Sequence, residues 1–349
     1  MQNSRILPFL IGSFLYTNPL TAQEQNVSPN PSSEQAGDRA TEIASITTDR
    51  GIVTQPGQFT IEPSLSYAHS NSTLVAIEGF TIIPALVIGL INVSEVQRDI
   101  FVGALSFKYG FTSRFEMSVR APYLRIEEDL RERQAFEGTP IDTLRESTGD
   151  GLGDVELSLR YQVNDGLDGW PYLISELRVK SPTGESPFDV PQRIVRDTEG
   201  NPIGVELSER PTGSGFWSFE PGLSFIYPSE PAVLFGNLSY VWTQEEDQGG
   251  NNGRIDPGNV VRFGFGMGFA FNERTSFSLS YSHSVIGDTS FEQNNSLTDS
   301  NFERIQVGSL AFGLSQRLSP STSLSLTVSV GATDEAPDTE ITLKLPMRF

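Results

Sequence analysis

The stretch Phe59–Tyr67 reads Phe-Thr-Ile-Glu-Pro-Ser-Leu-Ser-Tyr, with apolar residues at the odd positions and polar residues at the even ones. Alternation with a period of two places the two sets of side chains on opposite faces of a β-strand. A strand of about ten residues is also long enough to cross a bilayer when it is tilted. The stretch therefore predicts a strand with one apolar and one polar face.

The same alternation returns eleven more times between this stretch and residue 349. The further candidate strands are 101–109, 115–123, 155–161, 173–180, 219–227, 234–242, 261–271, 277–281, 305–318, 324–330 and 341–349. Tight links at 110–114, 164–170, 228–231, 272–274 and 319–321 alternate with long connections at 69–97, 127–150, 181–214, 244–258, 285–303 and 331–339. Short turns at one end and long loops at the other are typical of bacterial outer-membrane barrels. We expect an all-β fold, a transmembrane antiparallel up-and-down β-barrel of about 12 strands over residues 59–349.

The apolar faces of these strands carry almost no charge, whereas Lys, Arg, Asp and Glu fall on the opposite faces. A Lys or Arg on the lipid face near the midplane costs about 2–4 kcal/mol, which explains the separation. Aromatic residues near the strand ends are expected to form interfacial girdles; they are Tyr67, Tyr109, Tyr123, Tyr161, Tyr227, Tyr240, Trp242 and Tyr281. A soluble β-sandwich also alternates, but its exposed face would normally carry charge.

The N-terminal region has the features of an export signal. Arg5 is the only charged residue in the first 22 and precedes the apolar run 6–16, which is too short to span a bilayer as a helix. We interpret 1–22 as a signal peptide and 23–58, rich in Ser, Asn, Gln, Pro and Glu, as a flexible periplasmic leader. The expected location is the outer membrane of a Gram-negative type cell, with both chain ends in the periplasm.

Composition excludes several classes of function. The chain of 349 residues has a formal charge of -20, no Cys and two His. The negative charge argues against nucleic-acid binding, which depends on Lys and Arg. Without Cys and with so few His, neither a metal site nor any other cofactor is expected.

One long apolar segment, 73–91, does not alternate. Glu78 and Pro84 make it a poor transmembrane helix, so we interpret it as an apolar outer loop between the first two strands. Such a loop could capture a hydrophobic solute, or it could pack on neighbouring loops.

Two motifs suggest a family. The run Gly149–Tyr161 contains Gly-Leu-Gly-Asp before a strand, and the next strand ends in Ser-Pro-Thr-Gly at 181–184. Together with Phe-Gly-Asn-Leu-Ser-Tyr at 235–240, they resemble the outer-membrane transporter family of the MetA pathway of phenol degradation. The resemblance implies a channel that passes aromatic or other hydrophobic compounds, distantly similar to the long-chain fatty-acid transporters. The leader has no recognisable plug fold, and in this respect the chain differs from those transporters.

The polar faces of the early strands supply the candidate lumen residues. Ten charged side chains are expected to line a constriction or substrate path: Lys108, Glu116, Arg120, Asp154, Glu156, Arg160, Glu176, Arg178, Glu220 and Arg262. The later strands supply mostly Gly and Ser at their polar positions. Charges in so narrow a barrel must be paired. The resulting network could select solutes, or it could only fill and rigidify the lumen.

The expected partners are a small-molecule solute, outer-membrane lipids and lipopolysaccharide. The acidic connection 127–150 would disfavour anions at the mouth, or bridge to lipopolysaccharide through divalent cations. The terminal Phe349 resembles the signal by which barrel-assembly machinery recognises its clients. No nucleic-acid partner is expected.

Two other functions compete with a channel. An outer-membrane lipid hydrolase could use His283 beside Ser282, but neighbouring residues of a strand face opposite sides, so His283 is expected to lie with Tyr281 at the membrane interface. We therefore predict no catalytic residues. A structural barrel with a lumen filled by salt bridges would differ from a channel because it would not conduct.

Overall fold

The computed structural model describes residues 52–71, 93–134, 141–166, 169–196, 202–249, 253–293, 296–299 and 304–349. The expected signal 1–22, most of the leader and the apolar segment 73–91 lie outside the described residues. Twelve antiparallel passes of the chain, which we call staves, form one closed barrel, and each stave is one strand or two consecutive strands. In chain order they are β1 (Phe59–Ser70), β2 (Val93–Gly110), β3 (Phe115–Gln134), β4 (Ile141–Leu152) with β5 (Glu156–Gln162), β6 (Tyr172–Lys180), β9 (Ser218–Pro228), β10 (Ala232–Thr243), β13 (Val260–Ala270), β14 (Thr275–Ile286), β17 (Ile305–Ser319), β18 (Thr322–Gly331) and β19 (Thr339–Lys344) with β20 (Met347–Arg348). The predicted fold class is confirmed.

Each stave pairs with its neighbours in sequence, and the first pairs with the last. At this seam Ser64–His69 of β1 lie opposite Thr339–Lys344 of β19. Below them the backbone N–H groups of Phe59 and Phe349 each donate to the other's carbonyl, at 3.1 and 2.9 Å, and the two rings stack with centroids 5.1 Å apart. The barrel therefore has no free edge at the seam.

The outer surface of the barrel is apolar. Large hydrophobic side chains at the predicted lipid-facing positions are exposed, among them Leu65, Leu105, Leu238, Phe265 and Phe312, each more than half exposed. Their neighbours at the alternate positions face inward and are mostly buried. This band is what a barrel in a bilayer presents to lipid.

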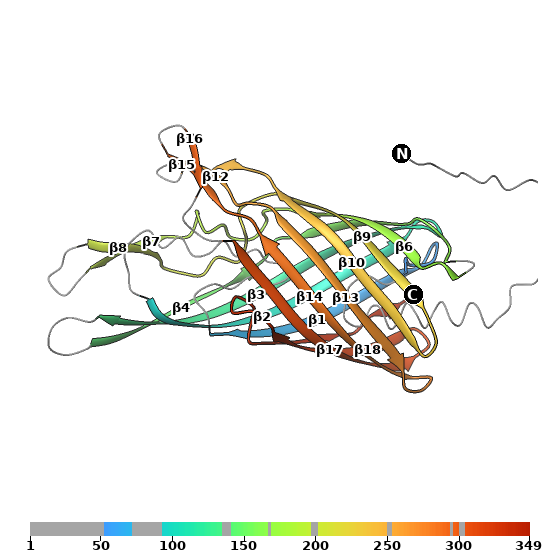
Figure 1. Cartoon of the computed structure of the whole chain (residues 1–349). Coiled ribbons are helices and arrows are strands. Elements are labelled where there is room, and N and C mark those ends of the chain that lie inside the picture. Colours follow the sequence, from blue (N-terminus) through green and yellow to red (C-terminus); the bar gives the residue numbers. More distant parts are fainter. Residues whose placement is uncertain are drawn as a thin grey trace, which may run out of the picture.

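The two ends of the barrel differ, as Figure 1 shows. Tight turns join the staves at one end, here called the short-turn end. At the other, the long-loop end, β3 and β4 continue outward as a hairpin, and small sheets form from β7 (Gln192–Arg196) with β8 (Pro202–Leu207) and from β11 (Glu246–Asp247), β12 (Arg254–Asp256), β15 (Ser290–Gln293) and β16 (Ser296–Asp299). The predicted alternation of short and long connections is confirmed, and several long loops contain strands of their own.

Two staves are interrupted, and of these only the last was predicted as one continuous strand, 341–349. Residues 153–155 leave the ladder between β4 and β5, so three residues lie opposite Ala121 and Pro122 of β3. This is the arrangement of a bulge, and Pro122 has no N–H to pair there. The last stave breaks at Leu345 and Pro346, which lie opposite Pro63 and Glu62 without an extra residue, because Pro346 has no N–H to pair. Asp154 lies in the first of these breaks and faces the lumen with Glu156 and Arg160, as the alternation predicted.

Candidate functional site: a charged belt across the lumen

The strand register brings the predicted charged residues side by side on neighbouring staves. Glu116 of β3 lies directly opposite Arg160 of β5, and Arg160 in turn lies opposite Glu176 of β6. Arg178 of β6 then lies opposite Glu220 of β9. Opposite charges at paired positions of adjacent strands are within reach of each other, so the belt continues from stave to stave.

Each of the ten predicted residues has an ion-pair partner in this belt. The N···O distances are Lys108–Glu62 3.1 Å, Arg160–Glu116 2.8 Å, Arg120–Glu156 3.7 Å, Lys180–Asp154 3.3 Å, Arg178–Glu176 3.5 Å, Arg178–Glu220 3.7 Å and Arg262–Glu220 3.1 Å. Two further residues, Glu62 and Lys180, complete the set that we call the charged belt.

The belt is buried and balanced in charge. Six carboxylates face six cationic groups, so its formal charge is zero although the whole chain carries -20. The side chains of Glu116 and Arg160 are 2% and 5% exposed, and that of Arg120 is the most exposed at 25%. Paired charges at this depth cross-link the staves firmly, because removing one partner would leave the other buried alone.

The facing wall of the lumen is built from small residues. On β13, Gly264 and Gly266 lie under inward side chains of β10: a Cβ at Gly264 would lie 2.8 Å from the Asn237 Oδ1, and one at Gly266 would lie 2.6 Å from the Phe235 Cζ. Ser278 of β14 faces inward and is 0% exposed. A small side chain on the inner wall can be covered so completely only if neighbouring and facing side chains reach over it. The space left by the small wall is thus occupied by other side chains around Ser278.

A carboxylate of the belt also anchors an outer loop. Asp154 accepts hydrogen bonds from the backbone N–H of Gly184 (3.1 Å) and of Ser214 (2.9 Å) and from the Ser214 hydroxyl (2.6 Å). The Thr212 hydroxyl donates to the Leu152 carbonyl at 2.8 Å, and Phe216 beyond it is 1% exposed. The Gly-Leu-Gly-Asp and Ser-Pro-Thr-Gly motifs therefore meet around Asp154, and loop 181–217 is fixed to the inside of the wall.

A second buried cluster lies above this anchor. Arg98 of β2 pairs with Glu128 of β3, whose other oxygen lies 2.8 Å from an Nη of Arg210 in the same loop. The loop is thus held at two levels by charged side chains. Sequence analysis placed Glu128 in the acidic connection 127–150. Instead, β3 keeps its alternation up to Gln134, so Glu128 is still part of the strand and faces the lumen.

At the short-turn end, residues 52–57 differ from the flexible leader that we expected up to residue 58. Gln55, Pro56, Gly57 and Gln58 form a turn with Gly57 at φ +76° and a 3.1 Å bond from the Gln58 N–H to the Gln55 carbonyl. Pro followed by Gly with positive φ is the signature of a type II turn. It reverses the chain, so that the residues before it run back along the inside of the barrel while β1 forms the wall.

This segment, which we call the N-terminal latch, is bound to the belt. The backbone N–H and the hydroxyl of Thr54 both donate to the Glu116 Oε2, at 2.6 and 2.5 Å. A Cβ at Gly110 would lie 2.3 Å from the Gln55 carbonyl oxygen, so the latch passes directly over that glycine. Pro56-Gly57 was the available signal in the sequence, and it was overlooked because the leader shows no apolar periodicity.

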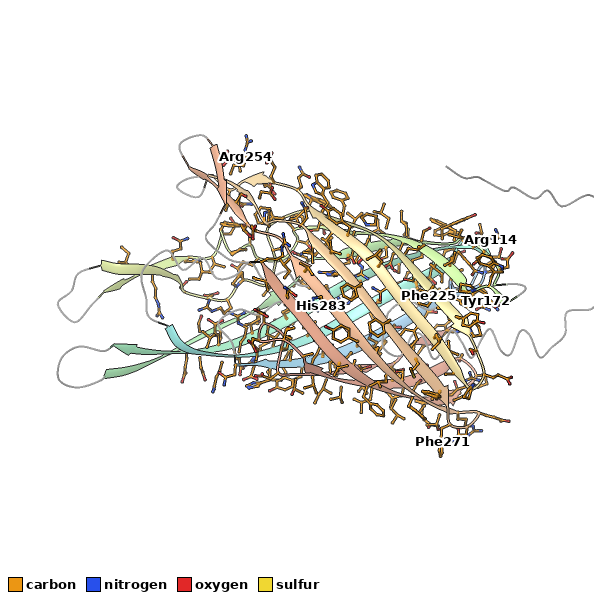
Figure 2. All side chains as sticks on the ribbon, in the orientation of Figure 1. Arg114, Tyr172, Phe225, Arg254, Phe271 and His283 are labelled. Atoms are coloured by element: carbon orange, nitrogen blue, oxygen red, sulfur yellow. The ribbon has the colours of Figure 1, made fainter. Side chains whose placement is uncertain are left out.

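The lumen also holds apolar residues that sequence analysis missed. Ile174, Ile226, Val233 and Phe235 face inward and form a buried cluster between 1% and 8% exposed, with Ile52 and Tyr172 packed against it. Figure 2 shows Tyr172 toward the same end of the barrel as Arg114. Arg114 belongs to the short turn before β3, so this is the short-turn end. The available signal was a local loss of alternation, because apolar residues occupy both faces in 172–174 and 225–227. A second inward cluster, Ala68, Ile100, Val102, Leu124 and Ile126, lies on β1 to β3.

The two histidines lie on the outer face. The His283 Nδ1 is 2.9 Å from the Tyr281 hydroxyl, and its ring packs on Phe263. Ser282 faces the opposite side, as the alternation predicted. The His69 Nδ1 is 2.8 Å from Asp99, which also accepts a hydrogen bond from Tyr67. Both histidines thus pair with residues of the wall.

Several solved structures are similar to this chain, and the one with the highest reported TM-score is described as an outer membrane channel. An outer membrane channel from Pseudomonas putida F1 matches with a TM-score of 0.55 and 15% identity, over 85% of this chain and 97% of its own. Weaker matches are the translocator domain of the autotransporter NalP from Neisseria meningitidis (TM-score 0.44, 8% identity, 91% and 95% covered) and the CymD monoaromatic hydrocarbon channel (0.41, 9%, 84% and 88%). The first supports the fold, and with the apolar outer surface it assigns the barrel to the outer membrane.

A family model matches the C-terminal part of the chain. Residues 202–349, from β8 to the last stave, match the model described as "Putative MetA-pathway of phenol degradation". The match includes the Phe-Gly-Asn-Leu-Ser-Tyr stretch of β10, on which the resemblance partly rested. The resemblance of this chain to the phenol-degradation MetA-pathway family is therefore confirmed.

Proposed function

We propose that the protein is an outer-membrane channel for the passive or facilitated uptake of small hydrophobic or aromatic solutes. The observation that carries the proposal is the charge-balanced belt, which crosses a closed barrel and lies next to inward apolar clusters. A belt without net charge gives no electrostatic preference for ions, while apolar inner surfaces favour apolar solutes. The family match and the channel-like fold support the same function.

The belt is proposed as the constriction of this channel. Its side chains are buried, so a solute can pass only when some of them move. The long side chains of Arg120 and Arg160 extend from two adjacent staves into the lumen. Of the belt residues, Arg120 is the most exposed and its closest ion-pair distance is a long 3.7 Å, which makes it the first candidate to swing aside.

Planar-bilayer recording tests the proposal. The chain from Gln23 onward, reconstituted alone, should give discrete conductance steps, and phenol added to the bath should alter them. Replacing Arg120 and Arg160 together by Gln should raise the conductance at least about twofold, because two long cations leave the constriction. Arg125→Gln is the matched control, since Arg125 is 66% exposed outside the lumen. Folded barrel with unchanged conductance in the double variant would remove the belt from the path.

One alternative is favoured by a specific observation. Glu116, Glu156, Arg160 and Ser278 are each 6% exposed or less, as expected of a structural barrel whose lumen is filled with salt bridges. Such a barrel would leave the bilayer silent under every condition above. The same recording therefore distinguishes the two functions.

Three expectations complete the proposal. Residues 1–22 act as a cleaved export signal, and Phe349, 60% exposed at the short-turn end, is recognised by barrel-assembly machinery. Lipopolysaccharide contacts the acidic outer loops through divalent cations. Mass spectrometry of the exported chain, beginning at Gln23, tests the first of these directly.

A further inference from the structure

The N-terminal latch places an apolar side chain where the lumen wall is apolar. Ile52 packs against the cluster of Ile174, Ile226, Val233 and Phe235. The register explains why these residues meet, because Ile226 of β9 lies directly opposite both Tyr172 of β6 and Phe235 of β10. Three adjacent staves thus build one apolar surface, which we call the seat.

The ring of Phe235 fits on the inside of the wall because its neighbour on the next stave is a glycine. Phe235 lies over Gly266, where any Cβ would lie 2.6 Å from its ring. The absence of a side chain at Gly266 therefore allows Phe235 to turn inward beside Ile226. The seat combines the two aromatic rings of Tyr172 and Phe235 with branched alkyl groups, and its residues carry no charge. Such a surface favours an apolar occupant, and aromatic edges add geometric preference for a ring.

Two kinds of contact hold Ile52 in the seat. One is the apolar packing itself. The other is the pair of hydrogen bonds from Thr54 to Glu116, two residues further along. Because Glu116 belongs to the charged belt, the seat and the constriction are adjacent along the lumen. A solute that has passed the belt toward the short-turn end meets the seat next.

We propose that the seat is a binding site for a small aromatic hydrocarbon, and that Ile52 of the latch competes with the solute for it. The proposal rests on the proposed function, because it names the site at which an apolar solute is held before it leaves the lumen. Ile52 then serves as a built-in occupant that keeps the apolar surface covered when no solute is present. Binding of the solute displaces Ile52 and loosens the latch.

The chain contains no Cys, so a single introduced thiol can report the position of the latch. In Ile52→Cys the thiol is small and apolar enough to occupy the seat, and it reacts with a charged, water-soluble maleimide only when it leaves. Toluene should increase the reaction rate about tenfold, the order expected when an apolar ligand replaces a side chain of this size. Glucose at the same concentration should have no effect.

Two matched variants identify the site. Ser321→Cys places a thiol in an exposed short turn, and its reaction rate should not respond to toluene. Phe235→Asn combined with Ile52→Cys should react faster without toluene and should lose most of the toluene response. If Phe235→Asn does not fold, Val233→Ser makes the same test with a smaller change in volume. An equal toluene effect at residues 52 and 321, or no effect at residue 52, overturns the proposal.

The thiol reaction does not require conduction, so the two proposals can fail separately. A barrel that conducts and responds to phenol, but whose thiol at residue 52 ignores toluene, would keep the channel and remove the seat as its site. A silent barrel whose thiol is released by toluene would keep the binding site and remove the channel.

Discussion

The two halves of the barrel wall differ in the size and charge of the side chains that face the lumen. From β1 to β9 the inner face carries long charged side chains in pairs, whereas β13, β14, β17 and β18 present mainly Gly and Ser. A twelve-stave lumen is too narrow for long side chains from every direction. The small wall therefore leaves the space that the side chains of the charged wall fill. A substitution on either wall should disturb the packing or the ion pairs of the facing wall.

Breaking a pair on the charged wall should have the largest effect on stability. Arg160→Ala removes the 2.8 Å partner of Glu116, which is buried, and should lower the free energy of unfolding by about 3–5 kcal/mol. Urea titration in lipid vesicles measures it. The matched change on the outside, Arg125→Ala, breaks an exposed pair with Glu127 and should cost less than about 1 kcal/mol. Equal costs for the two would mean that burial does not distinguish the belt.

Enlarging the small wall should have an intermediate effect. Gly266→Val puts a branched side chain where even a Cβ would lie 2.6 Å from Phe235, and overpacking of this kind costs about 1–3 kcal/mol. The same urea titration gives the value. Combining it with Phe235→Ala should restore part of the loss, because the clash with the ring disappears while the one with the Leu279 carbonyl oxygen, 2.7 Å from that Cβ, remains. An undiminished loss in the double variant would show that the two residues do not compete for space.

The smallest effect is expected where the small wall carries an unused polar group. The Ser278 hydroxyl is buried without a hydrogen-bond partner among the described residues. Ser278→Ala removes a desolvated group of nearly the same size, so the free energy of unfolding should change by less than about 0.5 kcal/mol or rise slightly. A clear destabilisation would instead show that the Ser278 hydroxyl makes a stabilising contact in the small wall.

The sequence predicted the barrel well because its period-two pattern is repeated and each repeat constrains one stave. It also predicted the belt, since the charges at Glu116, Arg120, Glu156 and Arg160 follow the inward positions and pairing is required by burial. Which acid meets which base depends on register across neighbouring strands, and one sequence does not contain that information directly.

The parts that were missed depend on contacts between distant segments. The latch reaches Glu116 from a region without periodicity, and loop 181–217 reaches Asp154 through one hydrogen bond from Gly184 and two from Ser214. The bulge at 153–155 lies opposite Pro122 on another strand. None of these leaves a repeated pattern, so only the assembled barrel brings them together.

The seam between Phe59 and Phe349 has a consequence for the order of folding. Eleven of the twelve stave-to-stave pairings join strands that follow each other in the chain, and one joins the first to the last. Hairpins with local contacts form quickly, whereas a contact across so long a sequence must first overcome the entropy of closing the whole loop. The seam should therefore form last, and until it does both terminal strands are open templates for pairing with another chain.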